Sequence, residues 1–282
     1  MRNEVFAGIV LYNPDVSLLK QELEALNSIG VSVIVVDNNS FNKSELIGLL
    51  AFYVNNVEVI WNEENQGIAK AHNQIIESCK KKGVDWVITF DQDSVIPDNM
   101  LSEYAHYTKL ENGIVSPTIN YLNSNKKIQF IQSEYSEKDW VIASASMINV
   151  KAWMSVGGFD EKMFIDLVDR DFCIRIRKAG YKIIVLNNVI LNHNLGNPVT
   201  KKFLFHSFTI SNHSAIRKYY KVRNYIYLYK KDEVGLLDCL YHIIQIFIET
   251  LFLEKNKKKK IASLFQGIGD GIKLSTKNSN TK

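Results

Sequence analysis

Two aspartates, Asp91 and Asp93, follow directly after residues 86–90, a short apolar run with no helical period. Such a run is typical of a buried strand in a parallel sheet, and Pro97 prevents it from simply continuing as a strand. Ligands of open α/β sheets bind beyond the carboxyl ends of the strands, where two carboxylates can hold one hard cation such as Mg²⁺ or Mn²⁺. The same residues also suit a turn or a helix N-cap, so this motif alone leaves both interpretations open.

Three further predicted strands also end in polar residues. These ends are Tyr12-Asn13 after strand 5–11, Asp37-Asn38-Asn39-Ser40 after strand 31–36, and Glu63-Glu64-Asn65 after strand 57–61. Together with Asp91 and Asp93 they would outline a ligand crevice along one edge of the sheet. Asp37 could accept hydrogen bonds from a pyrimidine imide or a ribose hydroxyl, or could simply belong to a turn. The chain has neither GxGxxG nor GxxxxGK(S/T), so a phosphate site would depend on a metal held by carboxylates.

The pattern of elements predicts the fold that positions these groups. Helical spacing at 17–29 and 68–82 alternates with the strands, which indicates an α/β fold with a mostly parallel, nucleotide-binding sheet flanked by helices. After residue 94 we expect strands at 114–116, 126–132, 141–148 and 182–186, and a helix at 169–179. Segments 126–132 and 141–148 should add to the sheet as antiparallel strands at an edge.

Composition limits the class of protein. With 282 residues, 46% of them hydrophobic, the chain can form a packed α/β domain plus an appendage. Cys79, Cys173 and Cys239 are widely spaced and include no CxxC, which argues for a reducing compartment without disulfides or a zinc site. The N-terminus lacks a signal peptide, and we expect no membrane-spanning helix because no uncharged apolar stretch of about 18 residues occurs. A cytoplasmic protein is the default expectation.

The character of the chain changes near residue 213, so we predict a catalytic domain at 1–212 and a helical C-terminal extension at 213–282. Basic and aromatic residues interleave in 217–231, where Arg223 suits bidentate phosphate binding. Nucleic-acid binding is the rival interpretation, but these aromatic residues must also pack, and we expect no nucleic acid. An amphipathic helix at 237–251 precedes Lys255 and the lysines at 257–260. We favour contact with an anionic membrane surface, on the inner face of the cell membrane, because a lipid-linked acceptor would require it. A homodimer face and a cover over the catalytic domain are the alternatives.

The motifs in combination resemble those of family 2, GT-A fold glycosyltransferases, most closely the bacterial rhamnosyltransferases. The matching motifs are Asp37-Asn38-Asn39-Ser40, Asn65-x-Gly67-x-Ala69-x-Ala71-x-Asn73, Asp91-x-Asp93-Ser94, Gly157-Gly158-Phe159-Asp160 and Phe164-Ile165-Asp166-x-x-Asp169-x-Asp171. The resemblance covers roughly residues 5–230. Each motif is weak alone, and their order along one chain makes the match specific.

The resemblance implies a role for each matched position. Residues expected to bind a nucleotide-sugar donor are Tyr12, Asn13, Asp37, Asn39, Asn65, Gly67, Asn73, Asp91, Gln92 and Arg223. Asp93 and His193 would hold Mg²⁺ or Mn²⁺. Asp169 occupies the place of the catalytic base, but Val168 replaces a common glutamate, and Asp166 and Asp171 stay rivals. Independently of the family, Asp169 begins a predicted helix, whose N-terminus favours an anion.

These roles predict an inverting, metal-dependent transferase that moves L-rhamnose from dTDP-L-rhamnose to a lipid-linked glycan. UDP-sugar donors such as UDP-galactose, UDP-glucose or UDP-N-acetylglucosamine are the alternative, because pyrimidine recognition does not separate thymine from uracil. A sugar-phosphate nucleotidyltransferase would need a glycine-rich basic loop where this chain has Tyr12-Asn13-Pro14. A non-catalytic binding module is the rival from another class, although Asp93 and Asp169 are both present.

Overall fold

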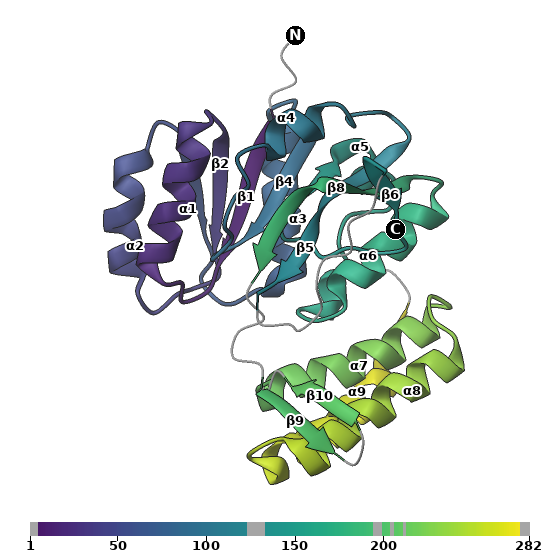
Figure 1. Cartoon of the computed structure of the whole chain (residues 1–282). Coiled ribbons are helices and arrows are strands. Elements are labelled where there is room, and N and C mark those ends of the chain that lie inside the picture. Colours follow the sequence, from purple (N-terminus) through teal and green to yellow (C-terminus); the bar gives the residue numbers. More distant parts are fainter. Residues whose placement is uncertain (1–4, 123–132, 194–198, 204–205, 211–212, 277–282) are drawn as a thin grey trace. The chain divides into compact units, whose positions relative to one another are not determined.

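The computed structural model describes residues 5–122, 133–193, 199–203, 206–210 and 213–276. The chain forms two compact units, shown in Figure 1. The first comprises Met1–Phe164 and Val168–His193, and the second comprises Ile165–Leu167 and Asn194–Lys282. The domain boundary predicted at residue 212 falls outside the described residues and stays a prediction.

The described part of the first unit contains an eight-stranded sheet with the order β3-β2-β1-β4-β7-β5-β8-β6. The strands are β1 (Val5–Leu11), β2 (Ser32–Asp37), β3 (Val57–Trp61), β4 (Trp86–Asp91), β5 (Asn112–Tyr121), β6 (Tyr135–Glu137), β7 (Ser146–Asn149) and β8 (Lys182–His193). Strands β1 to β4 are parallel, and β5 pairs in parallel with β8. The predicted α/β fold with a mostly parallel sheet is therefore confirmed.

The second half of the sheet differs from the prediction. Strand β7 is antiparallel to both β4 and β5 and lies between them, so its predicted place at an edge is wrong. It is also shorter than 141–148. A turn ends the extended run, since the Ser146 N–H donates to the Ala143 carbonyl at 2.9 Å and Ala145 has a φ of 56°. The antiparallel edge strand is β6, whereas the strand predicted at 126–132 lies outside the described residues.

Helices cover both faces of this sheet (Figure 1). They are α1 (Val16–Ser28), α2 (Lys43–Leu50), α3 (Gly67–Lys81), α4 (Met100–Ala105), α5 (Val150–Ser155) and α6 (Val168–Lys178), with 3₁₀ turns η1 (Ala51–Tyr53) and η2 (Glu161–Met163). Buried residues of α1, α2 and α4 share one apolar core with Ala7, Ile9 and Leu11 of β1. Helix α3 packs very close to β1, because a Cβ at Gly8 would lie 2.2 Å from Cγ2 of Ile75.

The second unit contains a hairpin and three helices in its described part. These are β9 (Val199–Phe203), β10 (His206–Ile210), α7 (Ala215–Lys230), α8 (Leu236–Ile248), which runs on into the π-helical segment η3 (Glu249–Leu253), and α9 (Lys257–Lys273). The predicted C-terminal helices are present, whereas neither the hairpin nor the full extent of α9 was expected. Helices α7 and α9 approach closely, since a Cβ at Gly267 would lie 2.6 Å from the Tyr219 carbonyl oxygen.

A buried ion cluster ties these helices together. The carboxylate of Glu254 forms one ion pair with the ammonium of Lys218, at 2.6 Å, and another with that of Lys260, at 2.8 Å. All three side chains are almost wholly buried. Lys260 therefore does not belong to the exposed lysine surface predicted at 257–260.

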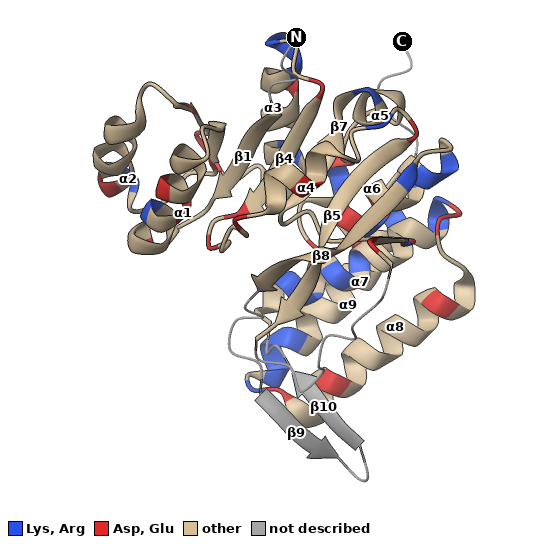
Figure 2. Ribbon diagram, turned by 45° about the horizontal axis from the view of Figure 1, so that its top comes forward, with Lys and Arg blue, Asp and Glu red and all other residues tan. Residues whose placement is uncertain are grey.

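One segment of the described chain, Leu236–Leu253, is long and apolar enough to cross a membrane, by length and composition alone. The sequence expectation of no such segment was too strict, because it required uncharged residues and this stretch contains Asp238 and Glu249. Figure 2 shows α8 as mostly uncharged, with basic residues recurring on α7 and at the start of α9.

Candidate active site

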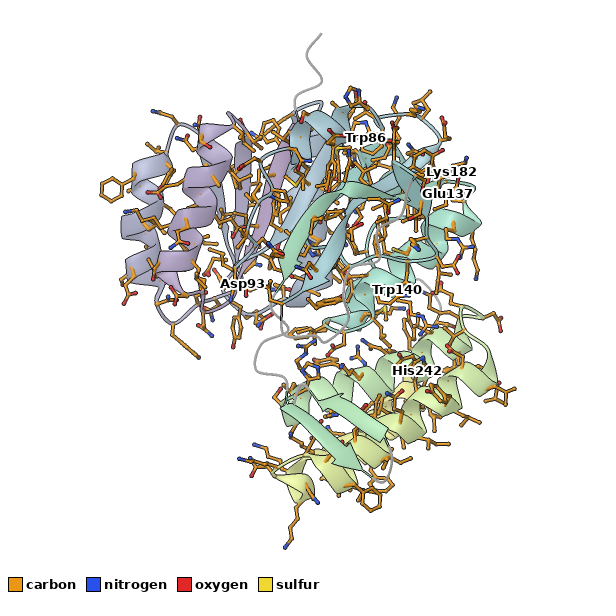
Figure 3. All side chains as sticks on the ribbon, viewed as in Figure 1. Trp86, Asp93, Glu137, Trp140, Lys182 and His242 are labelled. Carbon is orange, nitrogen blue, oxygen red and sulfur yellow. The ribbon has the colours of Figure 1, made fainter. Side chains whose placement is uncertain are left out.

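The ends of β1 and β4 meet at one edge of the sheet, as the sequence predicts. The side-chain oxygen of Gln92 accepts a hydrogen bond from the Tyr12 N–H at 2.9 Å and joins the two ends. Asp91 pairs with Val10 and is half-buried, whereas Asp93 is exposed beyond the strand (Figure 3). The structure thus brings Tyr12, Gln92 and both aspartates to one place.

The end of β2 joins the same edge through turn chemistry. Asp37 is fully buried and accepts hydrogen bonds from the N–H and hydroxyl of Ser40. The Ser40 hydroxyl oxygen in turn accepts from the Asn13 N–H at 2.8 Å. Asn13 and Asn39 both have left-handed backbone conformations, with φ of 52° and 64°, and Asn39 is exposed. Asp37 therefore shapes this turn, and its direct contact with a donor base stays a prediction.

The motif around α3 contacts Phe164, which lies between η2 and α6. Asn65 Oδ1 accepts from the Gly67 N–H at 2.9 Å and fixes the start of the helix. Gly67 has a φ of 80°, and a Cβ there would lie 2.6 Å from the carbonyl oxygen of Phe164. That carbonyl also accepts from the Ile68 N–H at 2.7 Å. Only glycine fits this contact.

Asn73 holds a turn that follows α5. Its Oδ1 accepts from the Phe159 N–H at 2.8 Å and from the Trp153 indole N–H at 3.1 Å, while its Nδ2 donates to the Phe159 carbonyl at 2.9 Å. The amide is thus engaged within the protein. This is a positioning role for Asn73, and its predicted contact with the donor stays untested.

Sequence analysis missed Glu22, which lies beneath the end of β4. It is a buried residue of α1, and neither carboxylate oxygen has a hydrogen-bond partner of ordinary geometry among the described residues. Burial, followed by the negative charges of Asp91 and Asp93, raises its pKa well above the usual range, and the nearby Ser94 N–H opposes this only in part. A glutamate at an apolar-face position of a helix would have been the only sequence signal.

This concentration of acid fits a divalent cation. Asp91 and Asp93 supply the hard oxygen ligands that Mg²⁺ or Mn²⁺ prefers, and a cation would relieve the repulsion that Glu22 experiences. Within the described residues, no three His, Cys, Asp or Glu side chains already gather as a metal site. His193 ends β8 opposite Tyr121, but its side chain lies outside what the structure describes.

The three aspartates around α6 have different surroundings. Asp171 is fully buried and bonds Arg175 Nε and NH2 at 2.8 and 2.6 Å. Asp166 belongs to the second unit, where its carboxylate accepts from Arg217 Nε at 3.1 Å and from Arg217 NH2 at 2.5 Å. Asp169, in the first turn of α6, lines a small hollow of the first unit together with Phe159 and Phe172.

Arg223 lies in the second unit, on α7. Its guanidinium donates to Asn224 Oδ1 at 3.0 and 2.7 Å and stacks over the Tyr220 ring at 4.6 Å. The side chain is largely buried. Its predicted donor contact stays a prediction, because the described geometry concerns the second unit alone.

Comparisons with known proteins identify the family of this chain. Residues 8–174 match the sequence profile of Glycosyl transferase family 2. The chain is 29% identical over 279 residues to dTDP-rhamnosyl transferase RfbF of Shigella flexneri, covering 93% of this chain and 92% of that protein.

Two solved structures show the fold alone, because sequence identity is low. TarS from S. aureus has a TM-score of 0.56 and 15% identity, covering 99% of this chain and 75% of the other. Mannosyltransferase PcManGT from Pyrobaculum calidifontis, in complex with GDP-Man and Mn²⁺, has a TM-score of 0.57 and 13% identity, covering 97% and 76%. The fold is GT-A-like, and since the family profile spans more than half of the sequence, the chain is a glycosyltransferase of family 2.

Proposed function

We propose that the protein is an inverting, metal-dependent rhamnosyltransferase that uses dTDP-L-rhamnose. The observation that carries the donor assignment is the similarity to dTDP-rhamnosyl transferase RfbF, which extends over nearly the whole of both chains. The strand-end aspartates and the hollow beside Asp169 support the catalytic part. Tyr12, Asn13, Asn39, Asn65 and Gln92 would surround the nucleotide.

Asp169 is the base in this proposal. The acceptor hydroxyl attacks the anomeric carbon, the bond between that carbon and the nucleoside diphosphate breaks, and Asp169 takes the hydroxyl proton. Direct displacement inverts the configuration at that carbon. The rivals Asp166 and Asp171 are less suited, because each already forms an ion pair with a half-buried arginine.

Asp91 and Asp93, with His193 as a further ligand, would hold the divalent cation. When bound, such a cation neutralises the charge of the departing diphosphate. The Mn²⁺ present in the similar mannosyltransferase structure supports this assignment.

The donor is tested by mixing the enzyme with dTDP-L-rhamnose, UDP-galactose, UDP-glucose and UDP-N-acetylglucosamine and measuring release of nucleoside diphosphate. We expect release from dTDP-L-rhamnose with Mg²⁺ or Mn²⁺, and none in EDTA. Preference for a UDP-sugar would replace the donor assignment. Binding without release from any donor would favour a non-catalytic module.

We also propose that the second unit contacts the cytoplasmic face of the membrane, where a lipid-linked acceptor would lie. Large apolar residues recur at helical spacing on α8 and are exposed: Leu237, Tyr241, Ile244 and Ile248. Leu237 is 83% exposed. Lys255 and the exposed lysines at 257–259 follow, and their charge suits anionic headgroups.

Vesicle flotation tests the membrane contact. Binding should increase with the fraction of anionic lipid and decrease with salt. Leu237→Glu should weaken it, whereas Leu110→Glu, which changes a leucine 76% exposed on the first unit, should not. A dimer whose formation depends on Leu237, without vesicle binding, would contradict membrane contact.

A further inference from the structure

A cavity of about 400 Å³ opens in the first unit on β5, β6 and β8, apart from the strand-end aspartates. Its volume lies within the range of small-molecule sites. Pro117, Ile119 and Val185 supply apolar lining, while Tyr121, Lys138 and Trp140 add two aromatic rings and a cation. The metal and base assignments above make no use of it.

Trp140 is the most unusual part of the lining. It is 53% exposed, although a tryptophan is among the residues that folding buries most effectively. Figure 3 shows Trp140 at the same edge of the first unit as Asp93. A pyranose ring carries C–H groups on its faces and hydroxyls around its rim. Its face packs by dispersion against a flat ring, and its hydroxyls bond polar groups nearby.

Among the described residues that line the cavity, Lys138 is the one cation, and the acidic residues on either side of it in the sequence have other partners. Glu137 pairs with Lys182 at 3.0 Å, and Asp139 pairs with Arg177 at 3.0 Å. Lys138, between these two acids, lines the cavity, and its ammonium has no hydrogen-bond or ion-pair partner among the described residues. This cation is therefore available to a hydroxyl or carboxylate of a bound sugar.

The cavity adjoins the hollow that holds Asp169. Val141 and Ile142 line both spaces, so one short segment separates the cavity from the proposed base. The segment is fastened to α6, because Cys173 Sγ donates to the Val141 carbonyl at 3.7 Å. A base must reach the hydroxyl of the sugar that accepts the transfer, and a sugar in this cavity would lie beside it.

We propose that this cavity binds a pyranose residue of the acceptor glycan, with Trp140 against its face and Lys138 at its polar rim. The proposal rests on the proposed function, since it assigns the acceptor side of the same reaction. Trp140 and Lys138 then determine which acceptors are used, while the donor is bound at the ends of β1, β2 and β4.

A panel of p-nitrophenyl pyranosides provides the probe. Saturation-transfer NMR should show contacts from the C–H groups of at least one member, and the same glycoside should serve as acceptor. Trp140→Ala should raise the KM for this acceptor by about tenfold, the effect of one aromatic contact of this kind. Trp140→Phe should recover most of the loss, and Lys138→Ala should raise the same KM independently.

Two measurements separate this proposal from the proposed function. Slow hydrolysis of the donor without acceptor should be unchanged in Trp140→Ala, because the donor side is intact. Phe52→Ala, which removes an aromatic side chain 86% exposed elsewhere in the unit, should leave acceptor KM unchanged. If the wild-type enzyme is active and both Trp140→Ala and Lys138→Ala have the wild-type KM for the acceptor, the cavity assignment is wrong. The proposed function is then unaffected. Absence of any transfer or donor hydrolysis by wild-type enzyme overturns both proposals.

Discussion

Two buried glutamates, one in each unit, have opposite surroundings. In the second, Glu254 lies between Lys218 and Lys260, and each buried charge has a counter-charge within 2.8 Å. In the first, Glu22 is buried beneath Asp91 and Asp93, and these negative neighbours raise its pKa further. A buried charge with a counter-charge can stabilise the folded protein. Carboxylates that lie close together repel one another and destabilise it, unless a bound cation neutralises them. The comparison supports the proposal that a cation binds at the end of β4.

The same contrast recurs within one helix turn on α6. Asp171 is locked to Arg175, whose NH1 also donates to the carbonyl oxygens of Val156 at 2.8 Å and Gly158 at 2.7 Å. That pair fastens the Gly157-Gly158 turn to α6. Asp169, two residues earlier, lines a small hollow. We therefore propose a structural role for Asp171 and the catalytic role for Asp169.

The largest effect is expected from Asp93→Ala. Loss of a carboxylate at the metal-binding edge should reduce transfer to background, because the diphosphate would lose its cation, while the fold stays intact. Nucleoside-diphosphate release measures this. Asp98→Ala, which removes another exposed carboxylate a few residues later, should stay active. Full activity of Asp93→Ala, or of wild-type enzyme in EDTA, would contradict the assignment of Asp93 as a metal ligand.

Asp169→Asn should lower turnover by roughly two to four orders of magnitude, because an amide does not accept the acceptor's proton. Donor affinity should change little. The matched variant Asp171→Asn should instead reduce stability, since it removes the counter-charge of Arg175. The base is wrongly assigned if Asp171→Asn is inactive but has the wild-type melting temperature, while Asp169→Asn stays active.

Glu254→Gln tests the compensated cluster. It leaves Lys218 and Lys260 buried without their carboxylate, and we expect a loss of roughly 3–5 kcal/mol in the free energy of unfolding. Glu249→Gln removes a carboxylate 3.7 Å from Lys218 and 23% exposed, so its effect should be much smaller. Urea unfolding of the full chain measures both. Equal stability of the two variants would contradict the structural role of Glu254.

Sequence patterns predicted the first half of the fold well and the second half poorly. Strands β1 and β3 match their predicted limits, because each is a short, mostly apolar run bounded by polar residues. Strand β7 was misplaced, since an apolar run does not reveal that a turn at 143–146 inserts it between β4 and β5. The hairpin of β9 and β10 was not predicted.

The candidate site shows the same limit. Asp91, Asp93 and Asp169 were recognisable because strand ends and helix starts position side chains locally. Asp37 and Asn73 carried the right motif, yet Asp37 bonds Ser40 within its own turn and Asn73 bonds the backbone of Phe159, which is distant in sequence. Glu22 and the cavity at Trp140 were missed, because burial and enclosure arise only when separate elements pack.

His72 extends the comparison with Glu22, because it is also a buried ionisable group, and it belongs to no proposed ligand site. Its ring is tilted against that of Phe159, with the centroids 5.1 Å apart, and neither ring nitrogen has a hydrogen-bond partner among the described residues. Burial lowers its pKa from 6.5 to about 4. The unfolded chain therefore binds the proton more readily, so stability is full above pH 6.5 and is lost as pH falls through about 4.

At pH 5 this difference amounts to roughly 2 kcal/mol of unfolding free energy. His72→Leu should remove that part of the acid sensitivity and flatten the curve of stability against pH between 4 and 6.5, whatever its effect at neutral pH. His106→Leu, which changes an exposed histidine at the end of α4, should leave the curve unchanged. Urea unfolding at pH 5, 6.5 and 8 gives the pH dependence of the unfolding free energy for the wild-type protein and for each of the two variants. If His72→Leu keeps the wild-type pH dependence, burial has not lowered the pKa of His72. The attribution of the raised pKa of Glu22 to burial would then also be weakened.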